Sequence, residues 1–462
     1  MYFDEHFIQG ALPDFTIINN HFPSDARFSI DSRTLKKGEI FVALSGQQTD
    51  GHKYIKQALD NGAAGIIIAE EKKDLLQNVQ QEIKNKLVIT VPDPFKALVR
   101  LAKAWRSQFN YPVIAITGSV GKTSTKMILA NIVSLQHEQF LVSTGNENTQ
   151  LGVALNMLKM RRNHTLSIFE VGISKRGEMA VIAEMLRPTN AVITCIGHSH
   201  MEGLGSLADI ALEKRDIFKY FTEESVGIIN GDQSLLAHVG YIHPVIKFGA
   251  KTINQVQARK IVKKEGCIEF LLKLYKQKYI IRLNQSHEGA VFNCLAAASV
   301  AHLIGISADL IAKGLTMPLT ISNRFEPLRL AICDGTVISD CYNANPESMK
   351  NALLAFENLQ ASGKKIAVLG DMLELGVTTP FWHRQLGRFL RKTPSVSHII
   401  LVGDFVKWTH KTIPVGLSCE LVSTWQEAAQ RLKNHVGTSS VVLVKGSHAV
   451  GLTHLVEQVV SK

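Results

Sequence analysis

The stretch "VIAITGSVGKTSTKMI", residues 113–128, is the feature that most constrains what this chain can fold into. Its first residues are apolar and mostly β-branched, two glycines follow, and an apolar helical pattern begins after a Lys-Thr pair. That order predicts a buried strand, a tight turn and a helix, the repeating unit of a parallel α/β sheet. Such a turn points successive backbone N–H groups and the positive end of a helix at one spot. The stretch therefore predicts a phosphate site.

Residue types in the turn suggest a division of labour. Gly118 and Gly121 would let the backbone approach a phosphate closely, Lys122 would supply a charge, and the hydroxyl of Thr123 would reach a magnesium ion. Ile116 stands where the usual, longer pattern has its first glycine, so this is a related loop, and simple turn chemistry is the alternative. The expected nucleotide contacts of the loop are Thr117, Gly118, Ser119, Val120, Gly121, Lys122, Thr123 and Ser124.

The rest of the chain predicts an α/β protein of three domains. A length of 462 residues exceeds one ordinary core. Residues 1–108 alternate short strand and helix patterns and read as a small α/β domain. Residues 109–320 read as a mostly parallel sheet with helices on both faces, with a β-meander between residues 251 and 283. Residues 321–462 carry the strand candidates "KKIAVLG", "SHIILVG" and "SSVVLVKG" and read as a Rossmann-like, doubly wound domain.

Composition narrows the class of protein. Hydrophobic residues make up 45% and charged residues 20% of the chain, as in soluble globular proteins. We find no leader pattern and no apolar run long enough to cross a bilayer, so we expect a cytoplasmic protein that does not use a membrane. The six cysteines are scattered, with neither a Cys-x-x-Cys pair nor a histidine cluster at zinc-ligand spacing, so free thiols are expected.

The net charge of +11 suits an anionic partner but does not identify it. The densest basic run, residues 258–266, lacks the interleaved aromatics of a single-strand-binding face and reads as a solvated strand or turn. We therefore expect no nucleic-acid partner. A GTPase switch is a second alternative, but the chain contains neither an Asn-Lys-x-Asp nor an Asp-x-x-Gly segment of the required kind.

Three further side chains follow strand candidates of the domain that carries the loop: Glu170, His200 and Lys214. The carboxyl ends of parallel strands meet at one edge of a sheet, beside the phosphate loop. Glu170 is therefore a candidate magnesium ligand, with a solvated loop acid as the alternative. His200 alone would more often be a surface histidine, and His198 lies only two residues away.

A resemblance becomes specific when the motifs are taken together. The segments "TGSVGKTST", "FEVGISKRGEM", "GHSHMEGLGSLADIALEKRDIF", "IINGD", "NRFEPL", "SDCYNANPESM", "VLGDMLELG" and "VLVKGS" occur in that order. This order and spacing resemble the Mur ligases, ATP-dependent amide ligases that build the peptide stem of the bacterial cell wall. "YNANP" and "LGDMLELG" look like the branch that adds D-alanyl-D-alanine to UDP-MurNAc-tripeptide. The resemblance runs from Asp31 to about Val460.

The resemblance implies roles for individual residues. Lys122, His200 and Lys214 would be catalytic. Two magnesium ions would be held by Thr123, Glu170, His200 and Lys214, the last as a carbamate formed with CO2. The nucleotide would also contact Asn293, Arg324 and Asp340. The substrates UDP-MurNAc-tripeptide and D-alanyl-D-alanine would contact Ser32, Arg33, Asn146, Asn148, Thr149, Tyr342 and Asn343.

Some points stay open on the sequence alone. The family's His-Asn before the adenine helix reads Gly289-Ala290 here, and the neighbouring residues 286–288 are candidates to replace it. His200, Asp340 and His383 are all eligible by type as general base for the incoming amine. A sister ligase that adds a diamino acid or a glutamate is the alternative within the same class. We expect a monomer.

Overall fold

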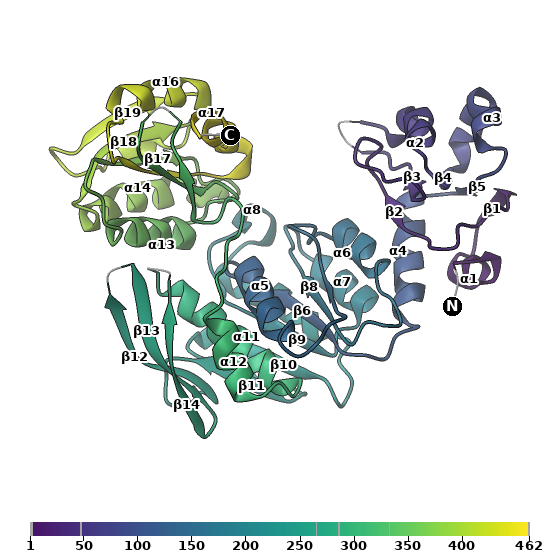
Figure 1. Cartoon of the computed structure of the whole chain (residues 1–462), viewed down its shortest axis with the longest axis horizontal. Helices are drawn as coiled ribbons and strands as arrows, with labels where there is room; N and C mark the ends of the chain where they lie inside the picture. Colours follow the sequence, from purple (N-terminus) through teal and green to yellow (C-terminus); the bar gives the residue numbers. More distant parts are fainter. Residues whose placement is uncertain (1–2, 47–48, 265, 285–286, 332, 461–462) are drawn as a thin grey trace.

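The computed structural model describes residues 3–46, 49–264, 266–284, 287–331 and 333–460, which form three domains, each built on its own sheet (Figure 1). The N-terminal sheet has the order β1-β5-β4-β3-β2, parallel except for β1. Its elements are α1 (Glu5–Ala11), β1 (Thr16–Asn19), β2 (Phe28–Ser29), β3 (Ile40–Val42), α2 (Ile55–Asp60), β4 (Gly65–Ala69), α3 (Gln80–Ile83) and β5 (Leu87–Val91).

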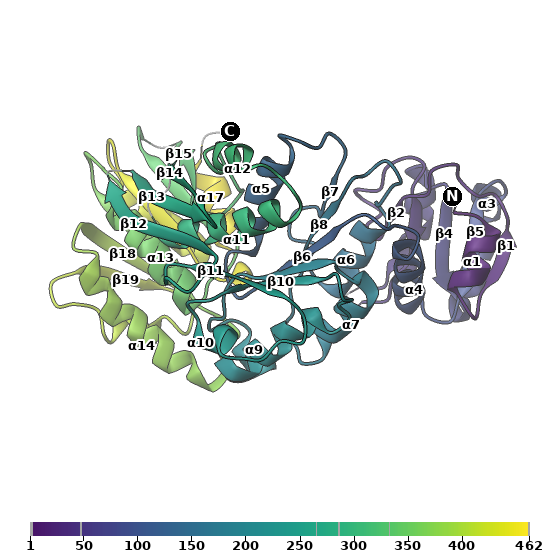
Figure 2. The ribbon, with the colours of Figure 1, turned by 90° about the horizontal axis from the view of Figure 1, so that it is seen from below.

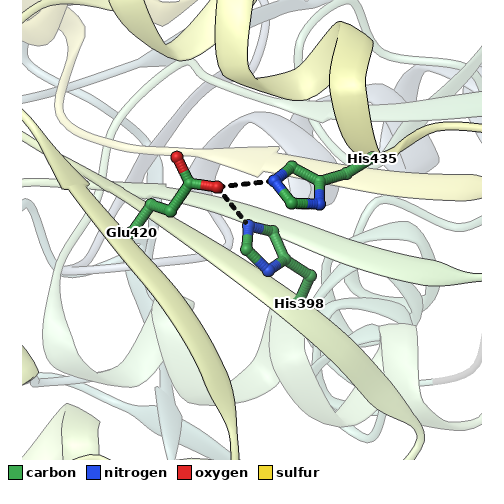
Figure 3. A group of neighbouring side chains, drawn as sticks. All are labelled: His398, Glu420 and His435. Carbon is green, nitrogen blue, oxygen red and sulfur yellow. Dashed lines mark hydrogen bonds and ion pairs between the residues drawn. The ribbon is translucent and has the colours of Figure 1, made fainter.

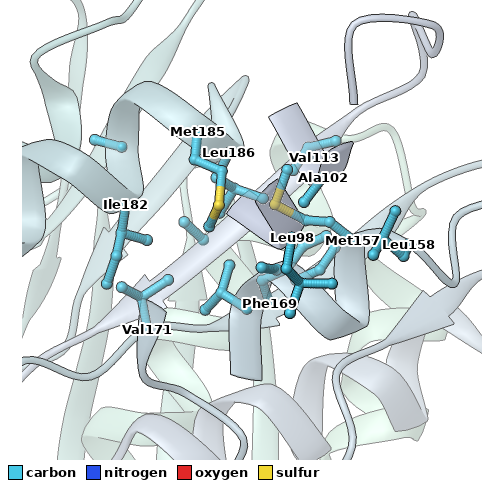
Figure 4. Packing of buried hydrophobic residues seen from close by; sticks show 14 of the residues in the cluster. Leu98, Ala102, Val113, Met157, Leu158, Phe169, Val171, Ile182, Met185 and Leu186 are labelled. Atoms are coloured by element: carbon cyan, nitrogen blue, oxygen red, sulfur yellow. The ribbon is translucent and has the colours of Figure 1, made fainter. Parts of the chain in front are cut away.

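A single helix, α4 (Pro94–Arg106), joins the N-terminal and central domains. Asp93 caps its first turn by accepting a hydrogen bond from the backbone N–H of Lys96, and Pro94 fits the first helical position. Its apolar stripe packs against helices of the central domain, and Figure 4 shows Leu98 and Ala102 within that cluster. The N-terminal and central domains therefore share one continuous hydrophobic core.

The central sheet has nine strands in the order β14-β13-β12-β11-β10-β9-β6-β8-β7. The expected meander, β12 to β14, is confirmed, and it extends the edge of this sheet because β12 pairs with β11. The strands are β6 (Val113–Thr117), β7 (Leu141–Val142), β8 (Ser167–Glu170), β9 (Asn190–Ile193), β10 (Val226–Asn230), β11 (Val245–Gly249), β12 (Val256–Lys264), β13 (Cys267–Leu274) and β14 (Gln277–Leu283).

Helices cover both faces of the central sheet, as the sequence predicts. Figure 2 shows α5, α11 and α12 on one face and α6, α7 and α9 on the other, and a separate hydrophobic cluster fills each side. The helices are α5 (Lys122–Val133), α6 (Gln150–Met157), α7 (Glu178–Leu186), α8 (Met201–Leu204), α9 (Leu207–Arg215), α10 (Ser234–Ala237), α11 (Gly289–Leu303) and α12 (Ala308–Leu315).

The C-terminal sheet has the order β15-β16-β20-β17-β18-β19, parallel except for β15. Helices α13 and α14 cover one face and α16 and α17 the other, which confirms a doubly wound domain. Its elements are β15 (Glu326–Arg329), β16 (Thr336–Asp340), α13 (Pro346–Glu357), β17 (Lys365–Gly370), α14 (Thr379–Phe389), β18 (Val396–Val402), α15 (Lys407–His410), β19 (Ser418–Val422), α16 (Trp425–His435), β20 (Val441–Lys445) and α17 (Leu452–Val459). Among the described helices, none is both long and apolar enough to span a bilayer.

Candidate active site between the central and C-terminal domains

A cavity of about 670 Å³ lies where the central and C-terminal domains meet. Both domains contribute polar side chains to its wall, which is the usual position of a ligand site in a multidomain protein. It gathers most of the residues singled out in the sequence: Ser119, Val120, Gly121, Lys122, Ser124, Asn148, Thr149, His200, Asn293, Arg324, Asp340, Tyr342 and Asn343.

The phosphate loop joins β6 to α5 with two glycines in conformations that other residues avoid. Gly118 has φ 145° and Gly121 has φ 87°, and Gly121 caps α5. A Cβ at Gly118 would collide with Thr194, and one at Gly121 with the side-chain oxygen of Asn293. Asn293, on α11, thus lies directly against the loop. The glycines are required both by the turn and by the close packing of its neighbours.

Ser119 has a structural part in this loop. Its backbone N–H donates to the carbonyl of Cys195 at 2.9 Å, and its hydroxyl exchanges hydrogen bonds of 2.9 Å with Gly197. The loop is therefore tied to the segment that follows β9. That segment leads to His198 and His200, so the phosphate loop and the histidines form one connected edge.

Glu170, at the end of β8, lies buried beneath the loop with only 1% of its surface exposed. Its two carboxylate oxygens accept hydrogen bonds of 2.8 Å, one from the hydroxyl of Thr123 and one from the amide of Asn148. Burial raises the pKa of Glu170, but the charges of Lys122 and Lys126 outweigh this effect and hold the pKa below its usual range. The glutamate is thus a buried anion, and the solvated-acid alternative is wrong.

Lys126 is a buried charge beside the site that the sequence analysis missed. Its ammonium group is buried, donates to the carbonyls of Ser143 and Gly145 at 3.0 and 2.7 Å, and lies 3.5 Å from Glu170. The signal in the sequence was a second lysine one helical turn after Lys122, in "GKTSTK". Lys126 provides a fixed positive charge beside Glu170.

Lys122 of the loop and Lys214 of α9 are two lysines whose pKa values are both lowered by burial. Burial lowers the pKa of Lys122, whose ammonium donates to the carbonyl of Gly118 at 2.8 Å. Lys214, on α9, is 1% exposed, and burial together with the charge of Lys122 lowers its pKa to about 7. A large fraction of Lys214 is therefore an uncharged, nucleophilic amine at neutral pH.

His200 begins α8 in a left-handed conformation, with φ 54°. Its Nδ1 lies 2.6 Å from a carboxylate oxygen of Glu374, in the loop after β17 of the C-terminal domain. Contact with His200 keeps the pKa of Glu374 below its usual range. The carboxylate thus lies against one ring nitrogen of a histidine that lines the cavity. Glu374 lies in the quoted "LGDMLELG" segment, but its partner could not be read from the sequence.

His198 has a partner in the C-terminal domain as well. Its ring nitrogen Nδ1 lies 2.5 Å from Glu347 at the start of α13, and its backbone N–H donates to the same carboxylate at 3.1 Å. Its ring also packs against Trp382, with 4.2 Å between centroids. The sequence analysis gave His198 no role, yet it joins the two domains at the edge of the cavity.

The C-terminal domain supplies the opposite wall. The guanidinium of Arg324 stacks on the ring of Tyr342 at 4.0 Å, and the ammonium of Lys445 lies 2.8 Å from a carboxylate oxygen of Asp340. His287 lines the cavity too, whereas residue 286 lies outside the described residues. His383 is fully buried elsewhere: Nδ1 donates to the carbonyl of Thr379 and Nε2 accepts from a backbone N–H. That bonding removes His383 from the candidate bases.

Other predicted residues lie outside the cavity wall. Thr123 and Lys214 are buried side chains that do not line it. Ser32 is buried in the N-terminal domain, where its hydroxyl donates to Gln57 at 2.7 Å, and Arg33 is exposed and bonded to Asp31. The predicted residues not lining the cavity are Ser32, Arg33, Thr117, Gly118, Thr123, Asn146, Glu170 and Lys214.

The fold and the site define a three-domain α/β protein with a phosphate-binding loop facing a cavity closed by its C-terminal domain. Family comparisons agree along the chain: the Mur ligase family catalytic domain matches residues 27–106, the Mur ligase middle domain residues 116–301, and the Mur ligase glutamate ligase domain residues 323–448. The chain belongs to the Mur ligase family.

Individual relatives and structures sharpen this relationship. The chain is 30% identical to the UDP-N-acetylmuramoyl-tripeptide--D-alanyl-D-alanine ligase of Bacillus subtilis, with 93% of this chain and 92% of the relative covered. It is 31% identical to the enzyme of that name from Rickettsia prowazekii, with 92% of this chain and 93% of the relative covered. The crystal structure of MurF from Acinetobacter baumannii superposes with a TM-score of 0.83 at 26% identity, over 99% and 98%. The crystal structure of the MurF ligase from Thermotoga maritima in complex with ADP superposes with a TM-score of 0.77 at 26% identity, with 94% of this chain and 96% of that chain covered.

Proposed function

We propose that this chain is the ATP-dependent ligase that adds D-alanyl-D-alanine to UDP-MurNAc-tripeptide, forming UDP-MurNAc-pentapeptide. The observation that carries the proposal is a single cavity with Lys122 of the phosphate loop on one wall and Arg324 and Asp340 of the C-terminal domain on the other. Relatives of nearly the same length are ligases of this name, and a structural relative binds ADP. This is the function expected from the sequence.

The reaction must activate a carboxylate before an amide can form. The terminal carboxylate of the tripeptide attacks the γ-phosphorus of ATP, the bond to the bridging oxygen breaks, and ADP leaves. The amine of D-alanyl-D-alanine then attacks the acyl carbon of the resulting acyl phosphate, and inorganic phosphate and a proton are released. Lys122 and the backbone N–H groups of the loop stabilise charge on the phosphoryl oxygens during the first step.

The residues around Glu170 fit a magnesium ion. An octahedral ion with bonds of 2.0–2.1 Å places neighbouring oxygen ligands about 2.9 Å apart. The hydroxyl oxygen of Thr123 and a carboxylate oxygen of Glu170 are 2.8 Å apart. Magnesium held here would draw electron density from the phosphates of the bound nucleotide. Lys122 and Lys126 keep Glu170 ionised for this role, and Asn148 donates a hydrogen bond to the second carboxylate oxygen.

Lys214 fits the expected carbamate. A carbamate forms when a neutral amine attacks CO2 and loses a proton, and the pKa of about 7 makes that amine available near neutrality. The product would be an anionic oxygen ligand, which suits a second magnesium ion shared with the free ring nitrogen of His200. Burial of Lys214 would also protect the carbamate from water.

We assign the remaining parts by position. Residues 1–108 hold the UDP-sugar through Ser32 and Arg33, residues 109–320 hold ATP, and residues 321–462 contribute to nucleotide and D-alanyl-D-alanine binding. Asn293 lies on the adenine side of the loop. Contacts to the two substrates also come from Asn146, Asn148, Thr149, Tyr342 and Asn343. The enzyme acts as a cytoplasmic monomer without nucleic acid or membrane, and its six cysteines are free thiols.

Mass analysis of the product tests the proposal. The purified chain, supplied with magnesium, ATP, UDP-MurNAc-tripeptide and D-alanyl-D-alanine, is expected to yield the pentapeptide and one phosphate for each amide formed. Phosphate release with meso-diaminopimelate in place of the dipeptide would instead favour the sister ligase. Intact ATP in both mixtures would refute both assignments.

A further inference from the structure

Three side chains of the C-terminal domain that no step of the ligase reaction uses lie close together: His398, Glu420 and His435 (Figure 3). Each offers one ligand atom, and these atoms lie within 4.8 Å of one another. They come from β18, from the neighbouring edge strand β19 and from the last residue of α16. None of the three lines the cavity between the domains.

His398 carries an unsatisfied nitrogen into this cluster. The residue is 5% exposed, and its Nδ1 is 2.8 Å from the hydroxyl oxygen of Ser418, its register partner on β19. Its Nε2 makes no hydrogen bond and points at Oε1 of Glu420, 3.4 Å away. Buried polar atoms are nearly always paired, so an unpaired ring nitrogen aimed at a carboxylate calls for a partner between them.

Glu420 cannot satisfy both histidines. The Nε2 of His435 lies 2.5 Å from the same oxygen, Oε1, and the two imidazole rings stack with 3.6 Å between centroids. The other oxygen, Oε2, lies 3.4 Å from the guanidinium of Arg431. One carboxylate oxygen therefore faces two ring nitrogens.

We propose that His398, Glu420 and His435 bind a divalent transition-metal ion of the zinc class. Two imidazoles and one carboxylate are a ligand set that zinc accepts, with a fourth position for water, whereas a pair of imidazoles matches magnesium poorly. Tetrahedral bonds of 2.0–2.2 Å place ligand atoms about 3.4 Å apart. Glu420 and His398 are already at this separation. His435 needs to retreat by about 1 Å, and the proton it shares with Glu420 is released.

The hydrogen bond between His398 and Ser418 completes the arrangement. Histidine ligands usually engage an oxygen through the second ring nitrogen, which fixes the tautomer and the ring orientation. Ser418 provides that oxygen from the strand beside His398. The bound ion would connect the edge strand β19, the adjacent strand β18 and the end of α16. Its role is therefore to fasten the outer edge of the C-terminal sheet.

Metal content after gel filtration tests this site. The full chain is incubated with Zn²⁺ or Co²⁺ in excess Mg²⁺, which occupies hard oxygen sites, and retained metal is measured by mass spectrometry. The wild-type protein is expected to retain one equivalent more than His435→Asn. In the Co²⁺ form, the wild-type chain should show the intense visible bands of a four-coordinate ion, and His435→Asn should lose them.

Three further variants test whether the retained metal is bound at this cluster. His454→Asn removes an exposed histidine that pairs with Glu457 at 3.2 Å, and it should retain wild-type metal content. Ser418→Ala keeps all three ligands and should weaken binding about 10–100-fold. Arg431→Gln removes a competing cation and should strengthen binding. Unchanged ligase turnover with magnesium shows that each variant is folded. Equal metal content and spectra in the wild type and His435→Asn would overturn the proposal.

Discussion

Glu374 of the C-terminal domain lies 2.6 Å from Nδ1 of His200 in the central domain, so a carboxylate from one domain orients a histidine of the other. The backbone carbonyl of Glu374 also accepts from the N–H of Glu202 at 3.1 Å. The same contact that closes the cavity therefore sets the direction of an imidazole in its wall.

Glu374→Gln is expected to lower kcat more than it raises KM for ATP. The amide cannot favour one imidazole tautomer as a carboxylate does, and loss of such an outer contact typically costs 10–100-fold in activity. Steady-state kinetics with all three substrates gives both constants. Glu202→Gln, which changes an exposed neighbour in the same contact segment, should leave both constants near wild type. Equal effects of the two variants would show that Glu374 has no orienting role.

Lys122→Met is expected to reduce kcat by about 10²–10³-fold, the effect of removing one group that stabilises developing charge. Its stability should be unchanged or higher, because burial lowers the pKa of Lys122 and the folded state therefore holds this cation at a cost. Single-turnover phosphate release and a urea unfolding curve measure the two quantities. Lys175→Met, at an exposed position, is the control. A variant that is both inactive and strongly destabilised would contradict this separation.

Lys126→Met is expected to lower the free energy of unfolding by about 1–3 kcal/mol, the cost of leaving buried acceptors without their donor. The carbonyls of Ser143 and Gly145 would lose the Lys126 ammonium, and Glu170 would keep only one of its two neighbouring cations, Lys122. Lys159→Met is the matched control, since that half-exposed lysine makes a surface ion pair with Glu147 and its loss should cost at most about 1 kcal/mol. Urea unfolding at pH 7 compares them, and equal losses would refute the role of burial.

Turnover should depend on CO2, and the protonation of Lys214 should set how this dependence changes with pH. The pKa of this amine is lowered to about 7, so the reactive neutral form is abundant above pH 7 and is lost by protonation as the pH falls below it. We expect CO2-depleted buffer to reduce turnover, and added bicarbonate to restore it, more strongly at pH 6.5 than at pH 8. Lys214→Ala should be inactive and partly rescued by a small carboxylic acid. Turnover that ignores bicarbonate at both pH values would exclude the carbamate.

Local patterns explain how much could be predicted. The strand, turn and helix around Gly118 and Gly121 are written in neighbouring residues, and the structure confirms them together with the parallel sheets and the edge meander. The contact of His198 with Glu347 joins residues 149 positions apart on different domains. No periodicity encodes such a pair, because it depends on how two finished domains dock. The cluster of His398, Glu420 and His435 could not be predicted from the sequence for the same reason, because it forms only when β18, β19 and α16 pack together.

The three domains meet at two interfaces, or seams, of opposite character, and helix α4 forms the first of them. The seam between the N-terminal and central domains is a shared apolar core, which dissolved ions hardly affect. The seam at the cavity depends on the pairs of His198 with Glu347 and of His200 with Glu374, which electrolyte screens. Rising ionic strength is therefore expected to loosen the interface at the cavity, while the apolar interface formed by α4 stays fixed.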